Sequence, residues 1–233
     1  MVQFRTHLAS LILKMRNLLL LAIFGIGQLA NAAPMAQSDI DQLIQKIQAL
    51  HNSEPSLQAN FREERHLAML KEPIVNEGKV WFTLPDKIRR EIGGKTPSTT
   101  VFDGKKMSIY YPNYQQVEVY DVEKRPMLKD SLRALTAGLD LRGVANFYEI
   151  EGSRDGGNYH IRLTPKTASV KKLVRSVELT IDDNLNPQSV NLEDARGQKI
   201  SETYTNVRRG SLPDSTFEFT TPPGAKVTTP LGS

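Results

Sequence analysis

The pieces GKVWFTLPDKIRREI (residues 78–92) and VFDGKKMSIYYPNYQQVEVY (residues 101–120) decide the fold. Apolar and polar residues alternate in both, which is the period of a strand with one buried face. Val80, Phe82 and Leu84 fall on one face of the first strand. We therefore expect antiparallel strands that share one long apolar face.

Two turns connect these strands. Asp103-Gly104 favours a tight hairpin, because glycine tolerates positive φ and aspartate tolerates the left-handed region. Tyr111-Pro112-Asn113 indicates a second turn. Short turns predict that consecutive strands are neighbours in one antiparallel sheet.

Composition bounds the class of protein. The chain has 233 residues, 39% of them hydrophobic, which suits one large domain with a leader. The absence of cysteine excludes disulfides, thiol nucleophiles and cysteine-based metal sites. The leader carries three of the 30 basic residues and no acid, so the remaining chain has 27 basic and 26 acidic residues, a net charge of +1. This balance gives no reason to expect a nucleic-acid partner.

Residues 1–32 have the pattern of a cleaved secretory signal peptide, which leaves 33–233 as the domain. Met15-Arg16-Asn17 supplies a positive start, an apolar core covers 18–27, and Ala30-Asn31-Ala32 forms a small-x-small cleavage site. Met15 is an alternative start. A membrane anchor over residues 8–27 is the competing interpretation, and two basic residues interrupt it.

Two segments have the period of amphipathic helices. The first runs from Ser38 to Leu50, with Ser38 as its cap. The second lies within residues 123–141, where leucines recur at helical spacing. Further alternating segments follow, including a strand at Thr216–Thr220, while the tail after Pro222 is expected to be extended or loose. About ten strands and two helical elements predict a curved antiparallel sheet with helices on one side.

No catalytic or metal-binding pattern is present. The histidines are scattered, and no nucleotide or hydrolase motif occurs. Glu63-Glu64 is interpreted as a pair of solvated side chains, and Arg89-Arg90 as solvent-facing or ion-paired. We expect neither an enzyme nor a cofactor. The apolar sheet face then covers either an ordinary core or a cavity for acyl chains, and the pattern alone favours the core.

Several motifs recur together in a fixed order. They are Phe61-Arg62-Glu63, Gly78 to Pro85, Asp103-Gly104-Lys105, Tyr110-x-Pro112, Gln116-Val117, Leu163-Thr164-Pro165-Lys166, Phe217-x-Phe219 and Pro222-Pro223-x-Ala225. This set resembles the periplasmic outer-membrane lipoprotein carrier family, LolA. The similarity covers residues 40–227, and its specificity comes from the order and spacing of the motifs behind a signal peptide.

The resemblance implies a mainly β (α+β) fold, an open, incomplete antiparallel β-barrel with an α-helical lid over an apolar cavity. It implies a monomeric periplasmic carrier that shields the acyl chains of lipoproteins without covalent chemistry. Cargo would come from an inner-membrane ABC release complex and pass to an outer-membrane receptor. The expected cavity lining is Leu43, Ile47, Leu57, Phe61, Val80, Phe82, Leu84, Ile109, Val117, Leu128, Leu132 and Leu135.

The chain also departs from the family pattern. Leu84 stands where the family has an arginine that holds the lid, Glu63 replaces a glutamine, and Ile88 and Arg90 replace an aromatic pair. These departures leave two alternatives open. One is a divergent paralogue that carries another lipid or a glycolipid. The other is a lipid-binding sensor that signals to a membrane partner.

Overall fold

A computed structural model of the chain describes residues 32–67, 69–124 and 143–230. The residues from Ala33 onward form one compact unit. The predicted leader, apart from residue 32, lies outside the described residues. The second predicted helix, with Leu128, Leu132 and Leu135, also lies outside them.

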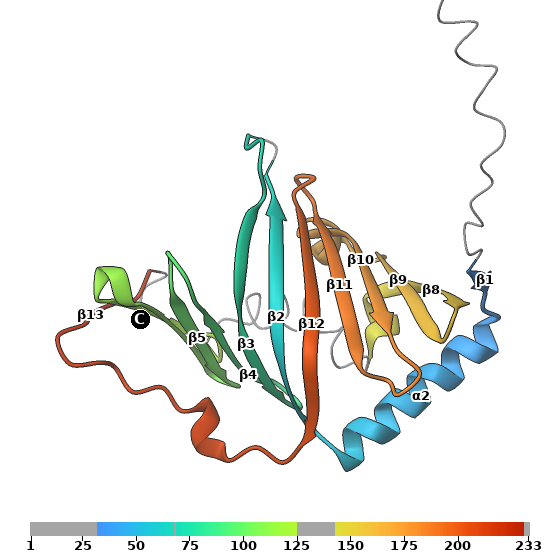
Figure 1. Ribbon diagram of the computed structural model, residues 1–233, viewed down its shortest axis with the longest axis horizontal. Helices are drawn as coiled ribbons and strands as arrows, with labels where there is room; N and C mark the ends of the chain where they lie inside the picture. The colour runs from blue at the N-terminus through green and yellow to red at the C-terminus, as the bar shows by residue number, and fades with distance from the viewer. Residues whose placement is uncertain (1–31, 68, 125–142, 231–233) are drawn as a thin grey trace, which may run out of the picture. The chain divides into compact units, whose positions relative to one another are not determined.

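The described residues form one sheet of thirteen strands in the order β1-β8-β9-β10-β11-β12-β2-β3-β4-β5-β6-β7-β13 (Figure 1). In the order of the chain, the first seven strands are β1 (Ala33–Pro34), β2 (Ser56–His66), β3 (Ile74–Thr83), β4 (Lys87–Ile92), β5 (Ser98–Asp103), β6 (Lys106–Tyr111) and β7 (Gln116–Asp121). The others are β8 (Tyr148–Asp155), β9 (Asn158–Pro165), β10 (Val174–Ile181), β11 (Pro187–Asp194), β12 (Lys199–Gly210) and β13 (Lys226–Thr228).

The helical elements among the described residues are α2 (Gln37–Ser53), α4 (Ala168–Lys171), η1 (Pro112–Tyr114), η2 (Val144–Asn146) and η3 (Asp214–Phe217). The helix α2 begins one residue earlier than predicted. Its cap is Ala36, whose backbone is extended and whose side chain makes no capping hydrogen bond, so the prediction that Ser38 caps it is wrong. Ser38 already lies within the first turn.

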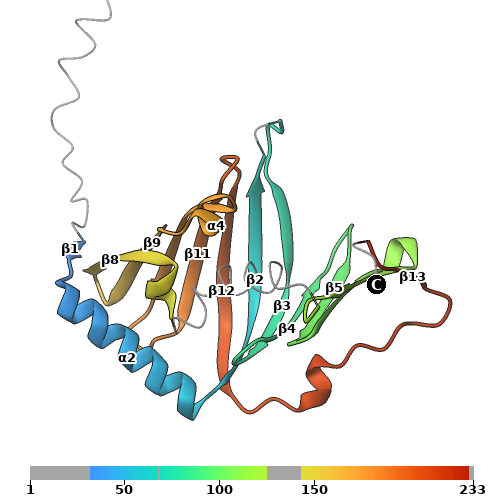
Figure 2. The same ribbon diagram turned by 180° about the vertical axis from the view of Figure 1, so that it is seen from behind.

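The helix α2 covers one part of the sheet. Ile40, Leu43 and Ile47 recur at helical spacing and are 3–4% exposed. They lie toward β8–β11, and the two opposite views show the helix running along these strands (Figures 1 and 2). The core cluster beneath the helix consists of Leu43, Ile47, Val144, Tyr148, Ile161, Leu163, Val170, Val174, Val177, Leu179 and Ile181.

The strands β2–β7 continue the same face. The register pairs Leu57 with Phe82 and Ala59 with Val80, so these four side chains share the face that α2 covers farther along. We call this the inner face. Trp81 lies on the opposite side of β3, where its Nε1 donates a hydrogen bond of 3.1 Å to Gln58. The predicted alternation is therefore present in the ladder.

The C-terminal segment differs from the prediction. The residues expected to form a strand at 216–220 instead begin with η3, and Phe217 is 3% exposed. The tail is not loose throughout, because β13 pairs with β7 in the parallel direction, with Val227 opposite Val117. A mainly β, open antiparallel sheet with a helical cover is nevertheless confirmed for the described residues.

Candidate functional site

An apolar pocket of about 80 Å³ lies between the C-terminal part of α2 and the inner face of the sheet. Its position follows from the chain path, because Pro55 links α2 directly to β2. The apolar wall is made by Ile47, Leu57, Val80, Phe82, Leu179, Ile181 and Val190. Tyr204 and Arg209 of β12 bring polar groups to its border. Such a pocket suits the end of an alkyl chain better than a charged metabolite.

Four residues of the predicted cavity lining meet in this pocket. They are Ile47, Leu57, Val80 and Phe82. Leu43 lies in the adjoining core under α2. These residues come from α2, β2 and β3.

The remaining predicted residues are more scattered. Phe61 pairs with Gly78 on the inner face, and Ile109 pairs with Thr100 on the same face, but neither lines the pocket. Val117 lies on the opposite face, because the register places its neighbour Glu118 beside Ile109. Leu84 follows β3 and is not part of the wall either.

Sequence reasoning missed the wall contributed by the second half of the sheet. Leu179 and Ile181 of β10 and Val190 of β11 face α2 across the pocket. The signal was present, since the segment 177–181 has apolar residues at alternate positions. What the pattern did not show is that β10 and β2 contribute to one concave surface.

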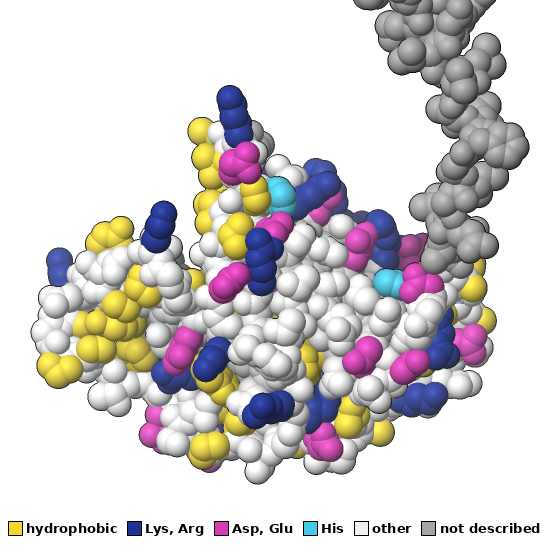
Figure 3. Space-filling model, in the orientation of Figure 1, with side chains coloured by type: hydrophobic (Ala, Val, Ile, Leu, Met, Phe, Trp, Pro, Cys, Tyr) yellow, Lys and Arg dark blue, Asp and Glu magenta, His cyan; other side chains and the backbone are white. Residues whose placement is uncertain are grey.

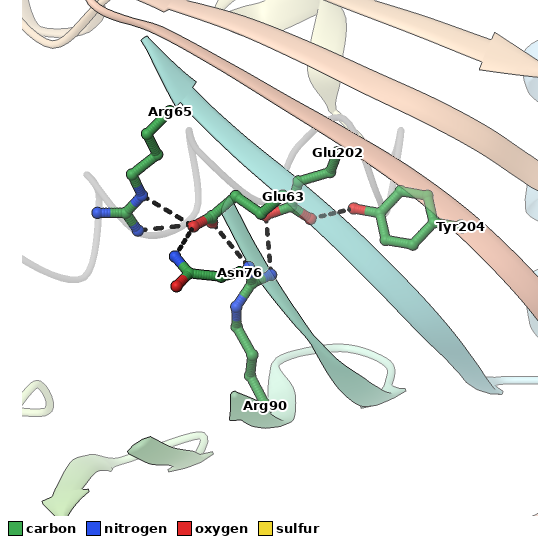
Figure 4. Close-up of polar contacts among 6 residues, drawn as sticks. All are labelled: Glu63, Arg65, Asn76, Arg90, Glu202 and Tyr204. Atoms are coloured by element: carbon green, nitrogen blue, oxygen red, sulfur yellow. Dashed lines mark hydrogen bonds and ion pairs between the residues drawn. The ribbon is translucent and has the colours of Figure 1, made fainter. Parts of the chain in front are cut away.

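A charged cluster lies on the inner face beside the pocket (Figure 4). Arg90 of β4 contacts Glu63 of β2 at 2.7 Å and Glu202 of β12 at 2.8 Å. The three side chains are 21%, 3% and 15% exposed. The strands β4 and β12 are three strand spacings apart, roughly 14 Å in a flat sheet. The contact is therefore made on the concave side of a curved sheet.

Further side chains complete the hydrogen bonding of the two carboxylates. Arg65 Nε and Asn76 Nδ2 donate to Glu63 Oε1 at 2.9 and 2.8 Å. The Tyr204 hydroxyl donates to Glu202 Oε2 at 2.7 Å. Because buried charges are costly unless paired and hydrogen-bonded, this network is what allows Glu63 to lie almost fully out of water.

The aromatic ring of Phe61 packs against the guanidinium of Arg90. The Arg90 guanidinium carbon lies 3.7 Å from the centre of the Phe61 ring, a cation–π geometry. The ring in turn lies against Gly78, where a Cβ would come within 2.9 Å of Phe61 Cζ and 1.8 Å of the Glu91 carbonyl oxygen. Gly78 is thus required by close packing of ring and backbone.

The two carboxyls of the cluster have opposite pKa shifts. Burial alone would raise the pKa of Glu63, but the hydrogen bond from Asn76 and the charges of Arg90 and Arg65 lower it overall. Burial raises the pKa of Glu202, and the nearby Glu63 adds to this effect while Arg90 opposes it. In both carboxyls the charge of Arg90 lowers the pKa and opposes the effect of burial.

The interpretation of Glu63 and Arg90 as solvent-facing is wrong for Glu63, and Arg90 is ion-paired inside the sheet. Their sequence neighbours behave as expected. Glu64 pairs with Arg62, and Arg89 pairs with Glu91 on the other side of the strands. In a strand, adjacent residues face opposite sides, so each doublet places one charge inward.

Residues 32–67, 69–124 and 143–230 contain neither a metal-binding group of side chains nor a helix that could cross a membrane. No group of three or more His, Cys, Asp or Glu residues is placed there to hold a metal ion. None of the helices in these ranges has the length and hydropathy needed to cross a bilayer.

Comparison with known proteins identifies the family. Residues 52–220 match the model of the outer membrane lipoprotein carrier protein LolA. The outer-membrane lipoprotein carrier protein of Chromohalobacter salexigens is 30% identical over 156 residues, covering 65% of this chain and 70% of the relative. That of Bordetella bronchiseptica is 27% identical over 210 residues, covering 89% and 94%.

A solved structure shares the fold. An uncharacterized conserved protein from Thermus thermophilus superposes with a TM-score of 0.50 at 13% identity, over 82% of this chain and 99% of that one. The family model spans more than half of the chain, including the pocket strands β2 and β3 and the charged cluster. The chain therefore belongs to the LolA family of outer-membrane lipoprotein carrier proteins.

Proposed function

We propose that this protein carries acylated lipoproteins and shelters their acyl chains against the inner face of the sheet. The observation that supports this best is the apolar pocket between α2 and β2–β3, in a chain of the LolA family. Burial of each methylene group there contributes roughly 0.8 kcal/mol, so binding needs no covalent chemistry. We infer a non-catalytic carrier.

Membership of the family supports the wider assignment. The relatives are named outer-membrane lipoprotein carrier proteins. We infer export to the periplasm through cleavage of residues 1–32, and action there as a monomer. Cargo would be received from an inner-membrane ABC release complex and delivered to an outer-membrane receptor.

The charged cluster favours a second candidate, a carrier of another lipid or a glycolipid. Two departures from the family pattern, Glu63 and Arg90, form one ion pair beside the pocket. Glu202 and Tyr204 extend this polar surface across β12. Arg90 and Glu202, which are 21% and 15% exposed, would offer a donor and an acceptor to the hydroxyl groups of a sugar, whereas acyl chains would not use them.

The identity of the cargo is tested by mass spectrometry of molecules that co-purify with protein from the periplasm. Triacylated lipopeptides are expected. A bound glycolipid or phospholipid in their place would support the second candidate, a carrier of another lipid, over the lipoprotein carrier. Protein that carries neither, even when the lipoprotein supply is raised, would contradict both.

The pocket itself is tested by filling it. Val80 lines the pocket and is half-buried, so Val80→Phe is expected to occupy the space for an alkyl chain and weaken binding of a fluorescent triacylated lipopeptide at least tenfold. Val119 is also half-buried but lies on the opposite face, opposite Ser108. Val119→Phe is the matched control and should bind as the unsubstituted protein does. Equal affinity of the two variants for the lipopeptide would contradict the assignment of the pocket as the acyl-chain site.

A further inference from the structure

The hairpin that connects β2 to β3 carries exposed apolar side chains. Met69 is 96% exposed, Leu70 49%, Ile74 41% and Val75 44%. The hairpin projects beyond the neighbouring strands, and hydrophobic side chains gather along it (Figures 1 and 3). We call these four residues the apolar tip. Soluble proteins seldom place several large apolar side chains together in water without a partner.

Fold stability does not account for the apolar tip. The pairing of β2 with β3 ends at Arg65 and Ile74, and none of the four residues belongs to the buried core. Polar residues in their places would leave the ladder below unchanged. The side chains therefore point to an interaction made outside the molecule.

A collar of charged residues follows the apolar tip along both strands. Arg62 contacts Glu64 and Glu77, and His66 lies 3.7 Å from Glu64. These charges lie beside the tip as well as behind it, since Arg65 pairs with Ile74 and Glu64 with Val75. Apolar side chains mixed with charged ones suit the interface between the hydrocarbon and the headgroups of one leaflet of a bilayer.

Size and charge favour a lipid surface over a protein partner. A protein interface of ordinary size takes about 20 residues or more from each side, and the apolar tip offers four apolar side chains on a narrow convex end. The charges of Lys71 and Glu72 at the turn cancel, so these two residues do not attract the hairpin to a strongly charged surface. Insertion of apolar side chains into the interface needs no such attraction.

We propose that the apolar tip inserts into the surface of a phospholipid bilayer and holds the protein there reversibly. Ile74 lies on the inner face, as Val80 does, so one side chain of the tip stands on the face of the sheet that carries the pocket. The proposal deepens the proposed function by naming a surface for contact with the membrane. It does not depend on the cargo, because an empty protein would bind the bilayer as well.

A site-specific fluorophore tests the insertion directly. The chain has no cysteine, so Met69→Cys gives a single labelling site for the environment-sensitive dye NBD. With vesicles of phosphatidylethanolamine and phosphatidylglycerol, the dye at residue 69 is expected to brighten and shift to the blue. The shift should persist at high salt. Tyr114 is 75% exposed on η1, and the dye on Tyr114→Cys is the matched control, which should remain unchanged.

Flotation of unlabelled protein with the same vesicles separates the tip from the pocket. The double variant Met69→Asp, Leu70→Asp should bind vesicles at least tenfold more weakly than Tyr114→Asp, with unchanged lipopeptide binding in solution. A dye at residue 69 that stays in a water-like environment, or equal flotation of the two variants, would overturn the proposal. If Val80→Phe loses lipopeptide binding but still floats with the vesicles, the membrane contact of the tip is supported and is independent of the pocket.

Discussion

The inner face of the sheet has two regions with different contents. Under α2, the side chains of β9 and β10 are apolar and closed to water, with Leu163 at 0% and Val177 at 5% exposure. On β3–β6, Val80 and Ile109 on the same face are only half-buried, and Arg90 lies among them with its two carboxylates. The first region is a packed core. The second keeps apolar surface accessible and uses charges to hold its curvature.

The difference shows why one sheet can serve two purposes. A helix with an apolar stripe covers β8–β11 and buries most of their inner face, leaving Leu179, Ile181 and Val190 as one wall of the pocket. Over β2 and β4, an arginine bound by two glutamates links strands that are not hydrogen-bonded neighbours in the sheet. Such a network stabilises a shape without filling the space above it, which suits a binding surface.

The largest effect is expected from Arg90→Met. Removal of the guanidinium leaves Glu63 and Glu202 facing one another in a buried site, and the free energy of unfolding at pH 7 should fall by about 3–5 kcal/mol. Urea denaturation measures it. Arg89→Met is the control, because Arg89 pairs with Glu91 at the surface, where such a pair contributes about 1 kcal/mol or less.

The double variant Glu63→Gln, Arg90→Met separates the charge effect from lost packing. It should recover part of the stability, since the repulsion between the two buried carboxylates is gone. If Arg90→Met and Arg89→Met lowered the unfolding free energy equally, the charged cluster would have no special role in the second region.

A smaller difference in the free energy of unfolding is expected when one apolar side chain is shortened in each region. Leu163→Ala in the packed core should cost about 2–5 kcal/mol, because it removes fully buried atoms and leaves a cavity. Ile109→Ala should cost about 1 kcal/mol, since its side chain is half-buried to begin with. Both values come from urea denaturation of the empty protein. Equal costs would show that the second region is packed as tightly as the first.

The smallest effect is the pH dependence contributed by Glu202. Its pKa is raised by burial, so the folded state binds this proton more tightly than the unfolded state does. The resulting stability is fully present below the unfolded pKa of about 4.5 and is lost as the pH rises through the folded pKa. Glu63, whose pKa is lowered, acts in the opposite sense and only below that pH.

We therefore compare urea midpoints at pH 5 and pH 7 for the unsubstituted protein and Glu202→Gln. The variant should lose less stability between these two pH values, because it has no proton to release at this position. An identical pH dependence of the two proteins would mean that Glu202 titrates as it does in the unfolded chain.

Much of the local structure was predictable from the sequence. The stripe of Leu43 and Ile47 predicted α2, and the alternation of Val80 and Phe82 predicted β3 and its buried face. Asp103-Gly104 predicted the turn between β5 and β6, where Asp103 Oδ1 accepts hydrogen bonds from the backbone of the turn. These features depend on residues close together in the sequence, so a periodic pattern is enough to reveal them.

The errors arose where distant segments meet. Val117 has the apolar character of a pocket residue, yet the register of β7 turns it to the other face. A shift of one position reverses every side chain of a strand, and no local pattern fixes the register. The parallel pairing of β13 with β7 joins segments about 110 residues apart. A tail rich in proline and glycine gives no sequence pattern that would predict this pairing.

The sequence by itself determined that this chain forms an antiparallel sheet with a helical cover, and its motifs resembled the family to which it belongs. Only the tertiary structure decided what that sheet encloses. Glu63, Arg90 and Glu202 are far apart in sequence and look like surface charges, and they form a buried cluster because the sheet curves and brings β4 to β12. The alternating pattern indicates which face is apolar, but curvature and register decide which charges lie inside it and how much of it remains open.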